Sequence, residues 1–106
     1  MSAKVSAAES AAVLREIVDG ARELRLRDPR RPWLQVAVGE CAFVADDAEL
    51  VFYADSATLD HVARVHLADG RGASFTDWMR DGEENPLDLL DEGERFELEQ
   101  RLHQAQ

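Results

Sequence analysis

The sequence predicts an α+β domain in which an N-terminal helix precedes an antiparallel meander sheet of four or five strands and a C-terminal helix follows it. Three observations predict this fold: apolar residues at helical spacing near both ends, apolar–polar alternation through the middle, and the Asp69-Gly70 pair between two alternating runs. Asp-Gly favours the tight turn of a β-hairpin because glycine adopts positive φ at little cost. Successive hairpins build a meander, and we expect both helices on one of its faces.

The first helix is expected from Ala7 to about Asp19. Ser6 and Glu9 have the spacing of a capping box, which satisfies free backbone N–H groups at the start of a helix. The apolar residues that follow recur at helical spacing: Leu14, Ile17, Val18 and Ala21. Two endings fit this pattern, a C-cap at Gly20 or a helix that continues to Arg27.

The chain after this helix is expected to become extended. Residues 24–26 suit an extended segment as well as a helix, and Trp33 to Val38 is predicted as a strand. Gly39 is expected to introduce a bulge or a tight turn. A slip of one residue there would bring Cys41 and Phe43 onto the face that Val38 occupies.

Two hairpins are predicted in the middle of the chain. Asp46-Asp47-Ala48 is a polar turn, and Glu49 to Ala54 is apolar on both faces, which predicts a central strand. Val62 to Phe75 alternates on both sides of Asp69-Gly70, with Ala73 and Phe75 on one face. Residues 59–68 also fit helical spacing, but β-branched residues and the Asp-Gly turn together favour a strand.

The C-terminal part is predicted as a loop, a helical turn and a helix. Asp77 to Glu84 is expected to be an acidic loop. Asn85 as a cap with Pro86 after it predicts a short helical turn, and Asp91 is expected to cap a helix that ends near His103. This helix is expected to bury three apolar residues: Phe96, Leu98 and Leu102.

Length, charge and cysteine content restrict the function classes. A chain of 106 residues predicts a single domain, and 45% hydrophobic with 32% charged residues is typical of a globular protein. The net charge is −10, which argues against direct binding of nucleic acid or of an anionic membrane. No apolar run is long enough for a membrane span, and the start lacks the apolar region of a signal peptide, so we expect a cytoplasmic protein. One cysteine excludes an intrachain disulfide.

Arginines form the clearest candidate for an interaction surface. The basic cluster consists of Arg22, Arg25, Arg27, Arg30 and Arg31. It is either a docking patch for an acidic surface or a phosphate, or a solvated segment whose arginines pair with nearby acids. Another copy of this acidic protein is the expected partner, in a homodimer. Trp33, Trp78 and Met79 adjoin predicted loops and are either interface residues or the edge of the core.

Other reactive residues give weaker signals. His61 and His66 are candidates for the polar group of a pocket, but five positions on a strand place them on opposite faces, so they cannot share a metal. Cys41 has an acidic neighbour and is expected to be a buried small hydrophobe. The carboxylates between Asp77 and Glu84 lack the spacing of an EF-hand loop. We predict no cofactor, no metal and no catalytic residue.

Short motifs along the chain carry a family resemblance. They are Val13-Leu14-Arg15-Glu16 with Gly20, Leu50 to Asp55, Leu59-Asp60, Asp69-Gly70-Arg71 with Phe75 and Trp78, Pro86 with Leu89-Leu90, and Glu94 with Leu98-Glu99 and Leu102. The layout resembles a family of short, uncharacterised bacterial proteins, common in pseudomonads and known only as a domain of unknown function. Members tend to carry cysteine and tyrosine where this chain has His61 and Val62. The resemblance implies no activity, cofactor or partner.

The predicted function is that of a small protein-interaction module that associates with itself and does not catalyse a reaction. One alternative is a small-molecule binding protein or enzyme with a pocket between sheet and helices, in which His61 or His66 is the polar group. A second alternative is an acidic mimic of nucleic acid that inhibits a DNA-binding protein. That role requires carboxylates arrayed along one face at phosphate-like spacing.

Overall fold

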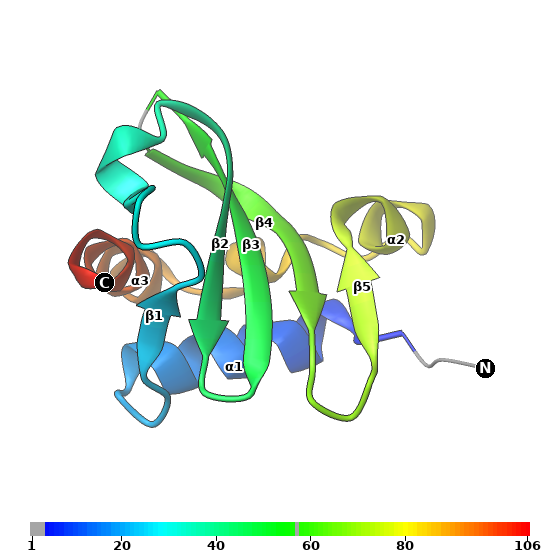
Figure 1. Ribbon diagram of the computed structural model, residues 1–106. Coiled ribbons are helices and arrows are strands. Elements are labelled where there is room, and N and C mark those ends of the chain that lie inside the picture. Colours follow the sequence, from blue (N-terminus) through cyan, green and yellow to red (C-terminus); the bar gives the residue numbers. More distant parts are fainter. Residues whose placement is uncertain (1–3, 57) are drawn as a thin grey trace.

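The structure, a computed structural model, describes residues 4–56 and 58–106 and confirms the predicted α+β fold (Figure 1). The elements, with η for a short 3-10 helix, are α1 (Ala7–Val18), β1 (Leu24–Leu26), η1 (Trp33–Gln35), β2 (Val38–Ala45), β3 (Ala48–Asp55), β4 (Thr58–His66), β5 (Gly72–Ser74), α2 (Phe75–Arg80), η2 (Pro86–Leu89) and α3 (Glu92–Gln104). Residue 57 lies outside the described residues, between β3 and β4.

The sheet is an antiparallel meander with the strand order β1-β2-β3-β4-β5, as predicted. β3 is the third of the five strands, which confirms its central place. Asp46 takes a positive φ of 56° in the turn between β2 and β3, and Gly70 takes 92° in the turn before β5. Residues 58–66 are strand and not helix, because the β4–β5 hairpin pairs Val65 with Ala73 across that turn.

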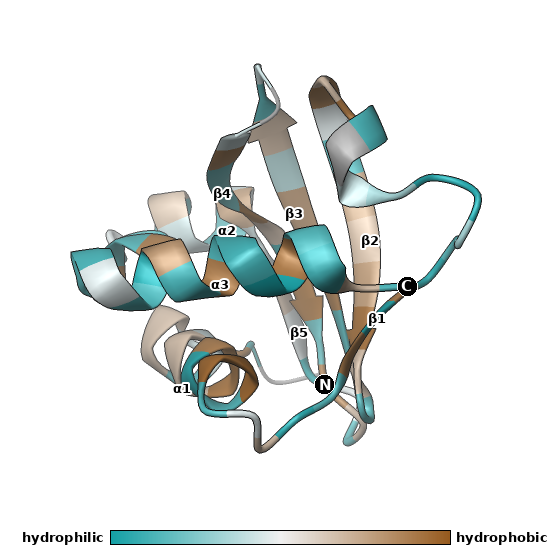
Figure 2. Cartoon of the chain, turned by 90° about the vertical axis from the view of Figure 1, so that its left-hand side faces the viewer, coloured by the Kyte–Doolittle hydropathy of each residue, from teal (hydrophilic) through white to brown (hydrophobic). Residues whose placement is uncertain are grey.

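The core lies between one face of the sheet and the helices. α1 crosses behind the sheet in Figure 1, and α3 lies beside it at the β1 edge. Figure 2 looks onto α3, with α1 below it and the strands behind, so both helices share one side as expected. Phe43 and Phe52 face this side and pack edge-on at 5.7 Å between ring centroids. The helices bury apolar side chains against them, among them Leu14, Ile17, Leu98 and Leu102.

Helix starts agree with their sequence signals. Capping boxes are formed by Ser6 with Glu9 and by Asp91 with Glu94, and Asn85 caps η2 through its side-chain oxygen. α1 ends at Val18, followed by Asp19 as C-cap and Gly20 at a φ of 82°, so the helix does not continue to Arg27. Residues 24–26 take the extended alternative and form β1.

The strand predicted from Trp33 to Val38 is wrong. Residues 33–35 form η1, which places the Trp33 ring in the core, 6.1 Å from the Phe43 ring. Burial of this large side chain outweighs the extended propensity of the segment. The bulge expected at Gly39 is also absent, because the β2–β3 register runs without a shift from the Val38–Asp55 pair onward. Val38 therefore lies on the face opposite to Cys41 and Phe43.

Two further predictions near the C-terminus are wrong. The expected acidic loop begins with α2, which Ser74 and Asp77 cap, and Phe75 belongs to this helix and not to a strand. The alternating pattern missed this helix because six residues are too few to show helical periodicity. Phe96 is 65% exposed on α3, while Leu98 and Leu102 are buried as predicted.

Candidate functional site

One face of the sheet has no helix over it in Figure 1, and this open face is the candidate site. We define the open face by the side chains of β2, β3 and β4 that point away from the core: Val38, Glu40, Ala42, Val44, Glu49, Val51, Tyr53, Asp55, His61, Arg64 and His66. Their register partners pair across the strands, so they form rows on one surface. The face carries apolar, aromatic and charged groups together.

An irregularity in the β3–β4 pairing brings both candidate histidines onto the open face. The register shifts between Val51 and Phe52 and again between Tyr53 and Ala54. His61 consequently pairs with Tyr53 and His66 with Glu49, four residues apart on β3 and thus on one face. The prediction that the histidines lie on opposite faces is wrong, because the first shift leaves Ala63 as an extra residue on β4 between them.

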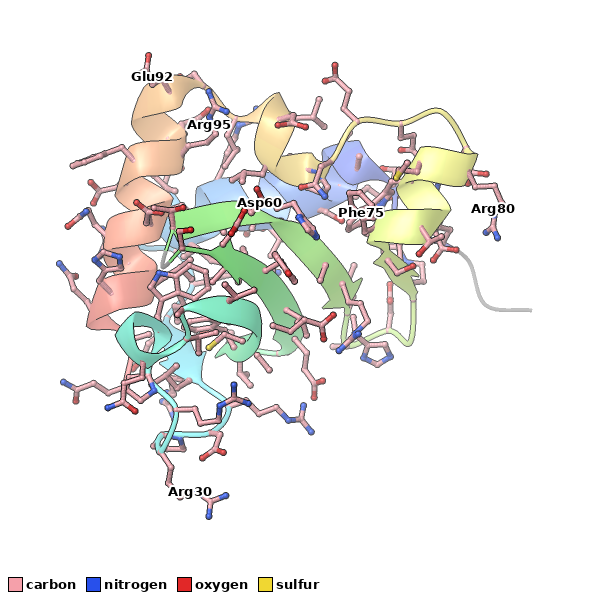
Figure 3. The ribbon with its side chains drawn as sticks, turned by 90° about the horizontal axis from the view of Figure 1, so that it is seen from above. Arg30, Asp60, Phe75, Arg80, Glu92 and Arg95 are labelled. Atoms are coloured by element: carbon pink, nitrogen blue, oxygen red, sulfur yellow. The ribbon has the colours of Figure 1, made fainter. Side chains whose placement is uncertain are left out.

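His61 lies in an aromatic stack. Its ring is parallel to the Tyr53 ring, with 4.9 Å between centroids and 10° between planes, and 4.6 Å from the Phe75 ring. Nδ1 of His61 lies 2.6 Å from a carboxylate oxygen of Asp60, which holds the ring orientation. Asp60 and Phe75 are labelled in Figure 3. The stack joins α2 to the sheet. In the described residues no group of three His, Cys, Asp or Glu side chains could hold a metal.

A hollow of about 570 Å³ opens near this stack on the open face. It lies along the part of β2 that does not pair with β1. We call it the arginine hollow. Ala42 and Val51 form its apolar floor, and four arginines, two acids and a cysteine complete it: Arg27, Arg30, Arg31, Arg64, Asp28, Glu40 and Cys41. The segment of residues 27–31 forms one wall, and Figure 3 shows Arg30 at the outer end of that wall.

Backbone contacts hold the 27–31 wall against β2. The Arg27 N–H donates to the Ala42 carbonyl at 3.1 Å, and the Cys41 thiol donates to the Arg31 carbonyl at 3.8 Å. Asp28 accepts from the Arg30 N–H through its side chain, at 3.1 Å, and from the Arg31 N–H through its carbonyl, at 3.0 Å. The arginine side chains therefore project from a fixed backbone.

Ion pairs occupy three of the four guanidinium groups. Arg27 lies 2.7 Å from Glu49, Arg64 lies 3.2 Å from Glu40, and Arg30 lies 3.1 Å from Asp28. The side-chain hydrogen bond from Arg30 lowers the pKa of the Asp28 carboxyl, as does the Arg30 backbone N–H. Within the part of the chain that the structure describes, Arg31 has no ion pair.

The predicted arginine cluster is only partly one site. Arg27, Arg30 and Arg31 come together in the hollow. Arg22 lies elsewhere and binds the β2–β3 turn, through the Ala45 carbonyl at 3.1 Å and Asp47 at 2.9 Å. Arg25 lies 3.4 Å from Glu23 on β1. Sequence reasoning missed Arg64, although its place on the polar side of a predicted strand was a usable signal.

The remaining candidates are mostly structural. Trp33 and Trp78 are each only 1% exposed, so neither can contact a partner while the protein is folded. Met79 is exposed on α2. Burial raises the pKa of the Cys41 thiol, opposed by the Arg31 charge, which argues against a reactive thiolate. Asp77 caps α2, and Asp81 and Glu83 accept from Lys4.

Comparison with known proteins places the chain in a family without giving it a role. A family model described as "Domain of unknown function (DUF7693)" matches residues 4–104. No curated protein and no solved structure matches the chain. The match spans nearly the whole chain, including the open face and the arginine hollow.

Proposed function

The chain belongs to this family of unknown function, and from that premise we propose that it is a protein-interaction module, without catalytic activity, that pairs with a second copy of itself through the open face. The observation that carries the proposal is a sheet covered by helices on one face and uncovered on the other (Figure 1). The uncovered face mixes apolar, aromatic and arginine side chains, the composition of an interface centre.

An apolar strip runs across the open face. Val38, at one end of β2, is 62% exposed, and Phe75 is partly exposed where it covers His61. Val51 and Tyr53 are half-buried between strands on the same face. Contact with a partner would remove this apolar surface from water, which favours association by roughly 25 cal/mol per Å².

The charges on the open face are self-complementary. Arg64 lies there beside Glu40, and Arg27, at the margin of the face, pairs with Glu49, so both signs are present on one surface. A two-fold axis through the face can set the arginines of one copy against the glutamates of the other. The start of α3, by contrast, lies far from the arginine hollow: Figure 3 shows Glu92 and Arg30 at opposite ends of the molecule. A contact between those ends would link copies head to tail, and not as the symmetric pair proposed here.

Two alternative functions have less support. A pocket between sheet and helices would need space that the fully buried side chains of Phe43, Phe52 and Leu98 fill. A nucleic-acid mimic needs an unbroken array of carboxylates, whereas those of the open face alternate with arginines.

The cellular setting is proposed on sequence grounds. A cytoplasmic location stays a prediction. None of the helices in residues 4–56 and 58–106 has the length and apolar character that a membrane crossing requires.

A pair of aspartate variants tests the proposed interface. Val38→Asp places a charge in the apolar strip, and we expect it to convert a dimer into a monomer in light scattering behind size exclusion. Phe96→Asp is the matched control, because Phe96 is equally exposed, at 65% against 62%, but lies on α3. Loss of the dimer with Phe96→Asp and its retention with Val38→Asp would move the interface to the helices and overturn the proposal.

A further inference from the structure

The arginine hollow has the size and composition of a site for a small anion. Its volume of about 570 Å³ lies within the range of natural ligand pockets, and polar groups converge on an apolar floor of Ala42 and Val51. Four arginines and two acids line it, and a third acid, Glu49, pairs with Arg27, so one excess positive charge remains, from +4 and −3. The whole chain carries −10, so this local excess opposes the charge of the rest of the molecule.

The backbone of the 27–31 wall is held in place without a ligand. Hydrogen bonds from Arg27 to Ala42 and from Cys41 to Arg31 fix both ends of the basic segment on β2. Pro29 lies inside this segment and Pro32 follows it, and their rings restrict the backbone further. A binding loop that is ordered in advance loses little conformational entropy when it captures a ligand.

Arg31 and Arg64 supply the donors that decide the ligand. Arg31 has no ion pair among the described residues, and Arg64 shares its guanidinium with the exposed acid Glu40 at 3.2 Å. A guanidinium group binds carboxylates and phosphates through two parallel N–H groups. Two guanidinium groups can each hold one acidic group, so Arg31 and Arg64 match a ligand with two negative charges, and the apolar floor suits a carbon skeleton.

We propose that the arginine hollow binds a small organic dianion, either a phosphate monoester or a dicarboxylate, with its acidic groups on Arg31 and Arg64 and its carbon skeleton on Ala42 and Val51. The site goes beyond the proposed self-association and does not require it, since every lining residue belongs to one chain; a second copy that contacts Arg64 would compete with the ligand.

Isothermal titration calorimetry with two probes tests the proposal and separates the two sources of the anion. The probes are phenyl phosphate and isophthalate, with benzoate as the single-charge control at the same ionic strength. We expect one of the two dianions to bind at least ten-fold more tightly than benzoate, which identifies the ligand class. Absence of binding by both at about 1 mM, or equal binding of benzoate, would overturn the proposal.

Variants locate the binding within the hollow. Arg31→Gln is expected to weaken binding about ten-fold or more, because a charge-assisted hydrogen bond is lost. Arg95→Gln is the matched control: Arg95 is an exposed arginine that also lacks an ion pair among the described residues, but it lines a different hollow beside α3. Equal weakening by both variants would show a response to net charge alone and contradict the site.

Two more variants complete the design. Arg64→Gln removes the second proposed donor and should weaken binding as Arg31→Gln does, so the proposal stays testable if one variant misfolds. Val38→Asp, outside the hollow, removes competition from a second copy and should bind the probe at least as tightly as wild type. Binding that is lost in this variant would mean that the site needs a second chain, against the inference.

Discussion

At the scale of single residues, one hydrogen bond distinguishes the two buried tryptophans. Nε1 of Trp78 donates to the Val5 carbonyl at 3.0 Å, whereas Nε1 of Trp33 is buried without a partner in the described residues. A buried donor without a partner has lost its hydrogen bonds to water and has gained none in the protein. Removing the donor of a buried carbonyl lowers the stability of the fold by about 1–3 kcal/mol.

We predict that Trp78→Phe lowers the free energy of unfolding by about 1 kcal/mol more than Trp33→Phe. Both substitutions remove a similar part of a buried ring, so the difference between them reports the hydrogen bond. Urea denaturation at pH 7 measures it. Equal losses for the two variants would show that the Trp78 hydrogen bond adds nothing to stability.

A second residue-scale prediction concerns pH. The hydrogen bond from Lys4, followed by that from the Ala7 N–H, lowers the pKa of the Glu83 carboxyl in the folded protein. A lowered folded pKa means that the unfolded state takes up the proton more readily, so this stabilisation exists above about pH 4.3 and is lost as pH falls.

We therefore expect wild type to be more stable than Glu83→Gln at pH 7 and the gap to close between about pH 5 and pH 3. The general effects of net charge act on both proteins and largely cancel in this comparison. Urea midpoints across this range provide the measurement. A gap that stays constant down to pH 3 would show that the charge of Glu83 is not what stabilises the fold.

At the scale of elements, side chains form hydrogen bonds with backbone groups of β4 that no neighbouring strand reaches. β5 pairs only with Arg64 to His66, and Asn85 takes over further along the strand. Its Oδ1 accepts from the Val62 N–H at 3.0 Å, and its Nδ2 donates to the Val62 carbonyl at 2.9 Å. Glu99 accepts from the Leu59 N–H at 2.7 Å. Asn85 thus closes a sheet edge and caps η2 at once.

We predict that Asn85→Ala lowers the free energy of unfolding by about 3 kcal/mol, because both backbone groups of the buried Val62 lose their partner. Asn85→Asp keeps the acceptor but sets a carboxylate oxygen against the Val62 carbonyl, so it should lose at least as much. Hydrogen exchange should accelerate at the Val62 amide in the alanine variant. A loss below about 0.5 kcal/mol, the level of an ordinary surface substitution, would contradict this account of the edge.

Elements with local sequence signals could be predicted, and elements that depend on distant contacts could not. Ser6 with Glu9, Asp91 with Glu94 and the Asp69-Gly70 turn act within a few residues, so their signals agree with the structure. η1 and α2 are too short to show a period, and tertiary contacts of the Trp33 and Trp78 rings decide them.

In the candidate site too, the groups that are close in sequence could be predicted, and those that tertiary structure brings together could not. Three arginines of the hollow adjoin one another in sequence and could be predicted as a cluster. Arg64 joins them only through the sheet register, and a bulge that the sequence does not signal places His61 and His66 on one face.

At the scale of the whole molecule, the sheet has one side covered by helices and one side without them (Figure 1). The molecule measures 35 × 25 × 24 Å, and the acidic start of α3 lies at the end opposite to the arginine hollow (Figure 3). Such a layout keeps like charges apart when two copies meet at their open faces. The apolar strip would supply most of the binding energy, and the arginines and glutamates would fix the orientation.

Light scattering behind size exclusion, on wild type in low salt and near 0.5 M salt, tests the central claim most directly. The account predicts twice the monomer mass under both conditions, because salt screens exposed ion pairs but leaves apolar contacts intact. A dimer that dissociates in high salt would make the arginines, and not the apolar strip, the main contact. The mass of a monomer in both buffers would contradict self-association through the open face.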